Sequence, residues 1–221
     1  MSNNANRNKG MYNQKREDYT RPEDDFFETP EVATYSLLSH LSIPENVTLW
    51  EPCCGWGAIS KVLKTATPNK VLSTELATDR YGIGGVNFFE ADEYKPKDPF
   101  WIITNPPYNI AADIIRKAID LGPQRIIMLL RLGFLESGKV REDILNNGHL
   151  FRVLMIKERL KMYPYGYQGD TNQTSKYTHA WFIWDKHYNS PVPTEVVVRR
   201  ISQKDGIAYK EMLRKDGVKC F

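Results

Sequence analysis

The sequence predicts an α/β fold in which a largely parallel sheet is covered by helices on both faces. Short apolar runs alternate with helical patterns through most of the 221 residues, which is typical of parallel strands joined by helical crossovers. A glycine-containing turn joins an early strand to a helix. A further apolar run, residues 100–104, stops abruptly at the rigid sequence Asn105-Pro106-Pro107-Tyr108.

The N-terminal part of the chain changes character near residue 26. Residues 1–25 are rich in Asn, Lys, Arg, Glu and Asp and have almost no apolar side chains, so we expect a disordered tail. A helix is predicted to follow, with Thr29 as its capping residue and Pro30 in its first position. Apolar residues then recur at helical spacing as far as Leu41.

The first predicted strand, residues 47–50, runs into the turn Glu51-Pro52-Cys53-Cys54-Gly55-Trp56-Gly57 and then into a helix. This is the first half of a nucleotide-binding βαβ unit, in which glycines let the backbone approach a ligand closely. The turn lacks the third glycine of a dinucleotide-binding site, and the carboxylate of Glu51 would repel a pyrophosphate. Glu51 is better matched to a cationic ligand that carries an ammonium and a sulfonium group.

Carboxylates also follow the next two predicted strands. Residues 71–74 form a strand that ends at Glu75, whose carboxylate can accept hydrogen bonds from both hydroxyl groups of a ribose. A solvated glutamate at a strand end is the alternative. Residues 86–90 are predicted to form a third short strand, and Asp92 in the following loop can accept a bond from the amino group of an adenine.

The segment around Asn105 has the most specific chemistry. Residues 100–104 are aromatic and β-branched and predict a buried strand, and the two prolines that follow fix two successive φ angles. Asn105 is therefore held at a carboxyl end of the sheet, where ligands bind in open α/β folds. An amide oxygen and a neighbouring main-chain carbonyl can each accept one N–H bond of an amino group and aim its lone pair at an electrophile. A plain strand-to-loop stop is the alternative.

The rest of the chain continues the alternation and ends in a C-terminal extension, residues 191–221, to which we assign no chemistry. The predicted elements are helices at 111–121, 135–145 and near 208–213, and strands at 125–130, 150–156, 179–184 and, at the sheet edge, 195–201.

Residues 157–178 differ from the rest, because basic and aromatic side chains are interleaved there among Gly, Pro, Asn and Gln. This composition suits phosphates and unstacked bases, so we expect a substrate-binding loop. Its candidate binding residues are Arg159, Lys161, Tyr163 and Tyr165. Residues 115–161 hold ten Lys or Arg against five Asp or Glu, which fits either a solvated face or a phosphate-facing surface.

Composition excludes several classes of protein. No stretch is apolar enough for a transmembrane helix, and the N-terminus is too polar for a signal peptide, so we expect a cytoplasmic protein with no membrane partner. The 3 cysteines form neither a disulfide framework nor a CxxC metal pair, and the 4 histidines lack metal-ligand spacing. No metal is therefore expected.

Taken together in this order, the motifs resemble those of the amino-group methyltransferases that use S-adenosylmethionine, specifically the adenine-N6 DNA type. The resemblance spans residues 26–185 and includes Phe-Glu-Thr-Pro at 27–30, the turn at 51–57, and Asn-Pro-Pro-Tyr at 105–108. Its last aromatic strand, at 180–185, is similar to that of small phage-borne members. The resemblance implies a Rossmann-like class I methyltransferase domain at 26–190, with a mostly parallel seven-stranded sheet whose last strand is antiparallel, in a bacterial or phage-infected cell.

The resemblance also implies a role for each motif residue. The cofactor-binding residues would be Phe27, Thr29, Glu51, Cys53, Gly55 and Gly57 at the methionine end, Glu75 at the ribose, Asp92 and the backbone of Glu93 at the adenine, and Asn105 beside the methyl group. Asn105 and the carbonyl of Pro106 would accept the target N–H bonds. Pro107 completes the rigid corner, and Tyr108 would stack on a base flipped out of the DNA helix.

The chain departs from the family in two ways. It has no room for a separate target-recognition domain, so recognition would come from residues 157–178 and the tails, or from a second subunit of the same or another chain. The second aromatic residue that stacks on the target base has no clear counterpart, because Met162 or Tyr163 occupies its place. Alternatives are methylation of cytosine N4, of an RNA base or of a glutamine side chain, and a cofactor-binding accessory subunit without activity.

Overall fold

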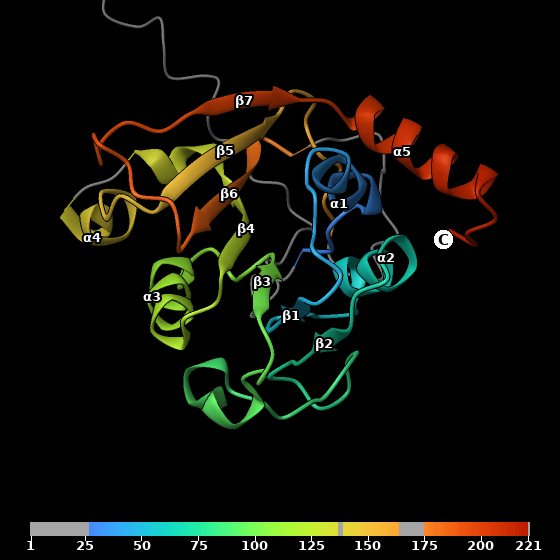
Figure 1. Ribbon diagram of the computed structural model, residues 1–221, viewed down its shortest axis with the longest axis horizontal. Helices are drawn as coiled ribbons and strands as arrows, with labels where there is room; N and C mark the ends of the chain where they lie inside the picture. The colour runs from blue at the N-terminus through green and yellow to red at the C-terminus, as the bar shows by residue number, and fades with distance from the viewer. Residues whose placement is uncertain (1–26, 137–138, 164–174, 221) are drawn as a thin grey trace, which may run out of the picture.

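A central β-sheet organises the part of the chain that the computed structural model describes, residues 27–136, 139–163 and 175–220 (Figure 1). None of the described helices is long and apolar enough to cross a membrane. In chain order the elements are α1 (Glu31–Leu38), β1 (Thr48–Glu51), α2 (Ala58–Ala66), β2 (Val71–Ser73), the 3₁₀ helix η1 (Phe88–Tyr94), β3 (Phe100–Thr104), α3 (Ala111–Leu121), β4 (Arg125–Arg131), the 3₁₀ helices η2 (Leu132–Leu135) and η3 (Lys139–Arg141), α4 (Glu142–Leu145), β5 (Leu150–Ile156), β6 (His179–Asp185), β7 (Val198–Ile201) and α5 (Gln203–Lys215).

The described strands form one seven-stranded sheet in the order β2-β1-β3-β4-β6-β5-β7. All of them run in one direction except β6, which lies between β4 and β5 and is antiparallel to both. The predicted fold class, a mostly parallel seven-stranded sheet, is therefore confirmed. The antiparallel strand is not the last one, because β7 adds a further strand parallel to β5 at the sheet edge.

Helices cover both faces of the sheet, as predicted (Figure 1). Alternate residues of each strand supply the two cores: on β3, Phe100 and Ile102 face one way, while Trp101 and Ile103 face the other. The first core is completed by α3, α4 and η1, and the second by α1, α2 and α5. Because both faces of the central sheet are buried, β3, β4 and β6 are apolar along most of their length and do not alternate with polar residues.

Two predicted elements are wrong. Residues 86–90 do not form a strand, because the side chain of Asn87 accepts a hydrogen bond from the backbone N–H of Phe89 (3.1 Å) and starts η1 instead. The predicted helix at 135–145 is also wrong: the described residues there form η3 and the short α4. The Ser-Gly pair at 137–138 has low helix propensity, and the predicted helix, which was based on apolar periodicity, neglected this.

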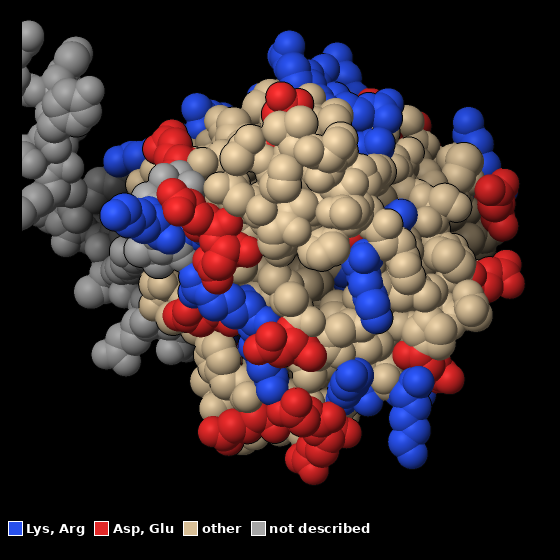
Figure 2. Space-filling model, turned by 60° about the vertical axis from the view of Figure 1, so that its left-hand side comes forward, with Lys and Arg blue, Asp and Glu red and all other residues tan. Residues whose placement is uncertain are grey.

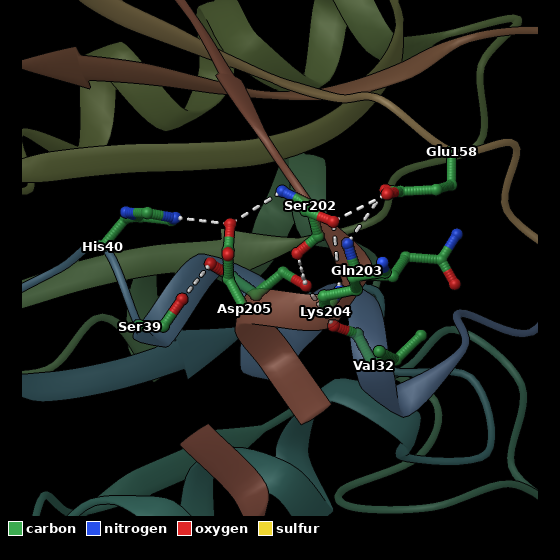
Figure 3. A network of polar contacts seen from close by, with 9 residues as sticks. Val32, Ser39, His40, Glu158, Ser202, Gln203, Lys204 and Asp205 are labelled. Carbon is green, nitrogen blue, oxygen red and sulfur yellow. Dashed lines mark hydrogen bonds and ion pairs between the residues drawn. The ribbon is translucent and has the colours of Figure 1, made fainter. Parts of the chain in front are cut away.

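The C-terminal segment is fixed to the core by the polar network of Figure 3. Ser202 caps α5 in a capping box with Asp205, and its hydroxyl also donates to Glu158 after β5 (2.6 Å). His40, just past α1, contacts the Asp205 carboxylate at 3.1 Å. The backbone of Ser202 and this histidine hold the pKa of Asp205 below its usual value. The network therefore ties α5 to two distant segments of the chain.

Helices α1 and α5 approach each other closely at Gly206. A Cβ atom at this position would lie 2.6 Å from the Ser36 hydroxyl and 2.6 Å from the Val32 carbonyl oxygen. Only glycine fits at this contact, and the Ser36 hydroxyl donates to the Ser202 carbonyl beside it (3.1 Å). The C-terminal helix is thus packed as part of the same helical layer as α1.

Candidate active site

The carboxyl ends of β1 and β3 lie at the point where the chain order of the sheet reverses. From β1 the chain continues to β2 on one side and later returns to β3 on the other side of β1. Open α/β sheets bind ligands in the crevice that such a reversal creates. A cavity of about 320 Å³ lies here, and its walls come from Phe27 and from residues 52–53, 75–77, 86–89 and 105–110.

The side-chain amide of Asn105 is fixed in one orientation. Its Nδ2 atom donates to the Thr29 hydroxyl (3.0 Å) and to the backbone carbonyl of Phe27 (3.4 Å). A carbonyl oxygen can only accept, so the nitrogen must face Phe27 and the oxygen must point the other way. The Oδ1 atom is buried and has no hydrogen-bond partner among the described residues. Such an acceptor is costly unless a ligand supplies an N–H group.

Thr29 has a different role from the predicted one. It does not cap the first helix: α1 begins at Glu31, Pro30 is its N-cap, and no side chain caps it. The buried hydroxyl of Thr29 instead accepts the hydrogen bond from Asn105. The reason is that Thr29 precedes the cap position by one residue and packs against the end of β3.

Glu75 and the glycine turn after β1 form a second fixed part of the site. One carboxylate oxygen of Glu75 accepts from the backbone N–H of Gly55 (2.6 Å), and the other accepts from that of Ala77 (3.2 Å). Arg80 lies 3.8 Å from the second oxygen. Glu75 also lines the cavity together with Cys53 and Phe27. Together with Asn105, four of the predicted cofactor residues therefore line one cavity.

Glu51 and Gly57 lie beside the cavity and are not among the residues that line it. The Glu51 carboxylate is buried and accepts from the backbone N–H of Ser60 (2.7 Å) and from the Ser60 hydroxyl. Burial, with a smaller contribution from the nearby Glu75 charge, raises the pKa of Glu51 to about 8. Gly57 has φ 81° and starts α2, and a Cβ there would lie 2.5 Å from the Tyr81 ring. Both residues therefore belong to the glycine turn at 51–57 and support it without lining the cavity.

Asp92 and Glu93, the predicted adenine-binding pair, lie outside the cavity lining. Both are exposed on η1, and Asp92 forms an ion pair with Lys117 of α3 at 2.5 Å. This hydrogen bond lowers the pKa of Asp92. The corresponding wall of the cavity comes instead from residues 86–89. Prediction placed the acidic pair in the cavity because it assumed a strand at 86–90.

The cavity has an apolar rim that sequence reasoning missed. Leu76 and Phe89 line it although their side chains are 67% and 42% exposed, and Ile110 lies on the same lining. Large apolar residues exposed around a concave site are typical of ligand binding. The available signal was a leucine directly after Glu75, in a segment with no helical or strand pattern.

A second cavity, of about 720 Å³, also has Tyr108 in its lining, so this residue borders both cavities. Four basic side chains line it: Arg131, Arg141, Arg159 and Lys176. Of the predicted substrate-binding residues that the structure describes, only Arg159 is found here.

The other predicted substrate-binding residues that the structure describes, Lys161 and Tyr163, lie elsewhere. Lys161 and Tyr163 line a third cavity, next to Thr29, and Tyr165 lies outside the described residues. The described part of the chain contains no cluster of three or more His, Cys, Asp or Glu side chains that could hold a metal ion.

Comparison with known proteins relies on structure alone, because no protein-family model and no curated protein sequence matches the chain. The methyltransferase subunit of a type I restriction-modification system from Streptococcus thermophilus has a TM-score of 0.52 and 12% identity. The match covers 73% of this chain and 45% of that subunit. The modification subunit of a candidate type I restriction enzyme from Vibrio vulnificus has a TM-score of 0.51 and 12% identity, over 89% of this chain and 54% of the subunit.

A candidate RNA methyltransferase from Pyrococcus horikoshii is similar to the same degree, with a TM-score of 0.53 and 13% identity over 74% of this chain and 87% of that protein. The chain spans about half the length of the two restriction-modification subunits and most of the length of the archaeal protein. These similarities show that the chain has the Rossmann-like fold of class I methyltransferases.

Proposed function

We propose that this protein transfers a methyl group from S-adenosylmethionine to the N6 amino group of adenine in DNA. The observation that carries the proposal is the buried, unpartnered Oδ1 atom of Asn105, held by two hydrogen bonds at the edge of a cavity. An acceptor preorganised in this way matches an amino group that must lose conjugation before it attacks an electrophile. The fold and the order of the motifs agree with this chemistry.

The residues around the first cavity fit the cofactor. Glu75 presents a carboxylate on the cavity wall, which suits the hydroxyl groups of a ribose. Leu76 and Phe89 supply apolar surface for an adenine ring, in place of the predicted Asp92 and Glu93. Phe27 and Cys53 line the part of the cavity that also contains Asn105, where the methionine end would lie. When bound, S-adenosylmethionine supplies an electrophilic methyl group.

The protein's own contribution is orientation. Asn105 Oδ1 and the carbonyl of Pro106 would each accept one N–H bond of the target amino group, which directs its lone pair at the methyl carbon. Pro106 and Pro107 keep these acceptors rigid, since a proline has a fixed φ angle. A bound cofactor would supply the methyl group and leave as a neutral thioether, and the methylated amino nitrogen, then positively charged, would release one of its protons. Because such a charged amino group is acidic, no strong base would be required.

DNA is the acceptor that the surroundings of Tyr108 favour. Its ring lies at the junction of the first cavity with the basic second cavity, where a base could stack and its backbone phosphates would meet positive charge. Two of the structurally similar proteins are subunits of restriction-modification systems. Recognition of a target sequence would need a second subunit or the loop at 157–178.

The experiment that tests the proposal uses radiolabelled cofactor with DNA, RNA and protein acceptors, followed by nucleoside analysis. N6-methyladenine in the DNA is the expected product. Label found only in protein, only in RNA or at cytosine N4 would contradict the proposal. Cofactor binding, measured by calorimetry in the same preparation, separates an inactive enzyme from a protein that never binds the cofactor.

Asn105→Ala is expected to lower the transfer rate by roughly 100-fold, because it removes a preorganised acceptor of the reacting group. Cofactor affinity should change little, since the amide oxygen faces the amino group of the acceptor. Asn146→Ala, an exposed substitution at the end of α4, is the matched control and should retain full activity. Equal activity in the Asn105 and Asn146 variants would refute the role of Asn105.

A further inference from the structure

Arg131 lies at the carboxyl end of β4, next to the strand that carries Asn105. Its guanidinium carbon is 4.8 Å from the centre of the Tyr108 ring and 4.1 Å from the centre of the Tyr177 ring. The planar group is therefore held between two aromatic rings, one of which also lines the first cavity. This position joins the proposed catalytic site to the second cavity.

The charge of Arg131 has no acidic partner in the described part of the chain. None of the ion pairs found there includes Arg131, and its buried Nε atom has no hydrogen-bond partner. Arg125, at the opposite end of the same strand, is paired with Asp185 at 2.7 Å. A partly buried guanidinium usually requires such a partner, because an unpaired charge away from water is costly.

The second cavity is positively charged as a whole. Among the described residues, Arg131, Arg141, Arg159 and Lys176 line it against a single carboxylate, that of Glu136. The effect reaches His179, which is buried beside Tyr108: burial, together with the charges of Arg131 and Arg159, lowers the pKa of His179 to about 4. At neutral pH this histidine adds no charge to the cavity.

The outer surface differs from this cavity. On the face shown in Figure 2, basic and acidic side chains lie next to one another over the lower half, and no surface of one sign extends across it. The chain as a whole has a net charge of only +3. The lower half of this face therefore mixes the two signs of charge, in contrast to the lining of the second cavity.

We infer that Arg131 binds a backbone phosphate of the nucleic-acid acceptor, in a subsite formed by the second cavity. Its guanidinium can offer two parallel N–H bonds to a phosphate, a geometry that the flanking rings keep in place. The inference deepens the proposed function and depends on it. A polynucleotide whose target base reaches Asn105 past Tyr108 would leave its adjoining phosphate on the Arg131 side of that ring.

The test measures binding of a short fluorescein-labelled oligodeoxynucleotide that contains one adenine, over a series of salt concentrations. Arg131→Met should weaken binding about tenfold and reduce the slope of log Kd against log salt concentration by about 0.7–0.9, the value for one lost phosphate contact. Arg131→Lys should keep the slope but bind less tightly than the wild type, because lysine lacks the planar fork. Arg214→Gln, an exposed arginine on α5, is the control and should change neither quantity.

A second arm changes the nucleic acid, so its wild-type measurements do not depend on the stability of any variant. Each phosphate beside the adenine is replaced in turn by a neutral methylphosphonate. One replacement should weaken wild-type binding about tenfold and have no further effect on Arg131→Met. The assignment would be overturned if the losses in binding from the methylphosphonate and from Arg131→Met were fully additive. It would also be overturned if Arg131→Met left the salt slope unchanged. A matched series of oligoribonucleotides distinguishes DNA from RNA as the source of the phosphate. If binding depended on Arg131 with RNA alone, the subsite would be retained and RNA would be the acceptor.

The two proposals fail in different ways. A wild-type protein that binds the cofactor and methylates neither DNA nor RNA contradicts both of them. A wild-type protein that methylates DNA, with an Arg131→Met variant equal to it in affinity and salt slope, contradicts the Arg131 assignment alone.

Discussion

Replacing Thr29 by valine tests how the proposed catalytic amide is held. Valine has nearly the same shape as threonine but cannot accept the hydrogen bond that Asn105 Nδ2 now donates at 3.0 Å. The amide would then be held only by its longer bond to the Phe27 carbonyl, at 3.4 Å. We expect the amide to lose its fixed orientation, so that Oδ1 meets the target amino group less often.

The size of the effect follows from the value of one hydrogen bond. A typical intramolecular hydrogen bond contributes about 0.5–1.5 kcal/mol, and about 1.4 kcal/mol corresponds to a factor of ten in rate. Thr29→Val should therefore lower the rate of methyl transfer by roughly three- to tenfold. Thr29→Ser keeps the hydroxyl group and should retain most of the activity.

The assay is a single-turnover measurement of methyl transfer, combined with calorimetry of cofactor binding. It separates two roles for Thr29, because the sequence resemblance makes this residue a cofactor ligand and the structure shows its hydroxyl on Asn105. If Thr29→Val raised the Kd of the cofactor tenfold and left the single-turnover rate unchanged, the positioning role would be wrong. Equal losses in the serine and valine variants would also contradict it.

Two further predictions concern the dependence of stability on pH. Burial raises the pKa of Glu51 to about 8, so its contribution to stability is complete below the ordinary carboxyl pKa of 4.5 and is lost as the pH rises through about 8. Between pH 4.5 and about 8, the melting temperature of Glu51→Gln, measured without cofactor, should therefore fall less steeply with pH than that of the wild type. Parallel curves of melting temperature against pH for the two proteins would refute this. The pKa of Asp205 is lowered, chiefly by the backbone N–H of Ser202 and then by His40, so its contribution is present above pH 3.8 and is lost as the pH falls through its lower native value. The difference in melting temperature between the wild type and Asp205→Asn should therefore shrink in acid, and a difference that did not vary with pH would exclude this linkage.

The sequence by itself determined the elements whose signal is local. Residues 100–104, 111–121 and 150–156 were assigned to the strand, helix and strand that the structure has, because runs of apolar residues and a closing Gly-Pro pair mark their limits. The rigid corner after β3 and the glycine turn after β1 were also visible, since proline and glycine restrict or free the backbone wherever they occur. The proposal for cofactor and acceptor rests in part on the order of these motifs.

Only the tertiary structure decided which side chains meet. Thr29 and Asn105 are separated by 76 residues, and no local pattern shows that the hydroxyl of one accepts from the amide of the other. Asp92 faces Lys117 and lies away from the cavity because η1 replaces the expected strand. Arg131 ends an apolar strand and is held between Tyr108 and Tyr177, which a one-dimensional pattern cannot indicate. Contacts of this kind depend on how the sheet brings strand ends together, whereas the strands themselves depend on residues adjacent in the chain.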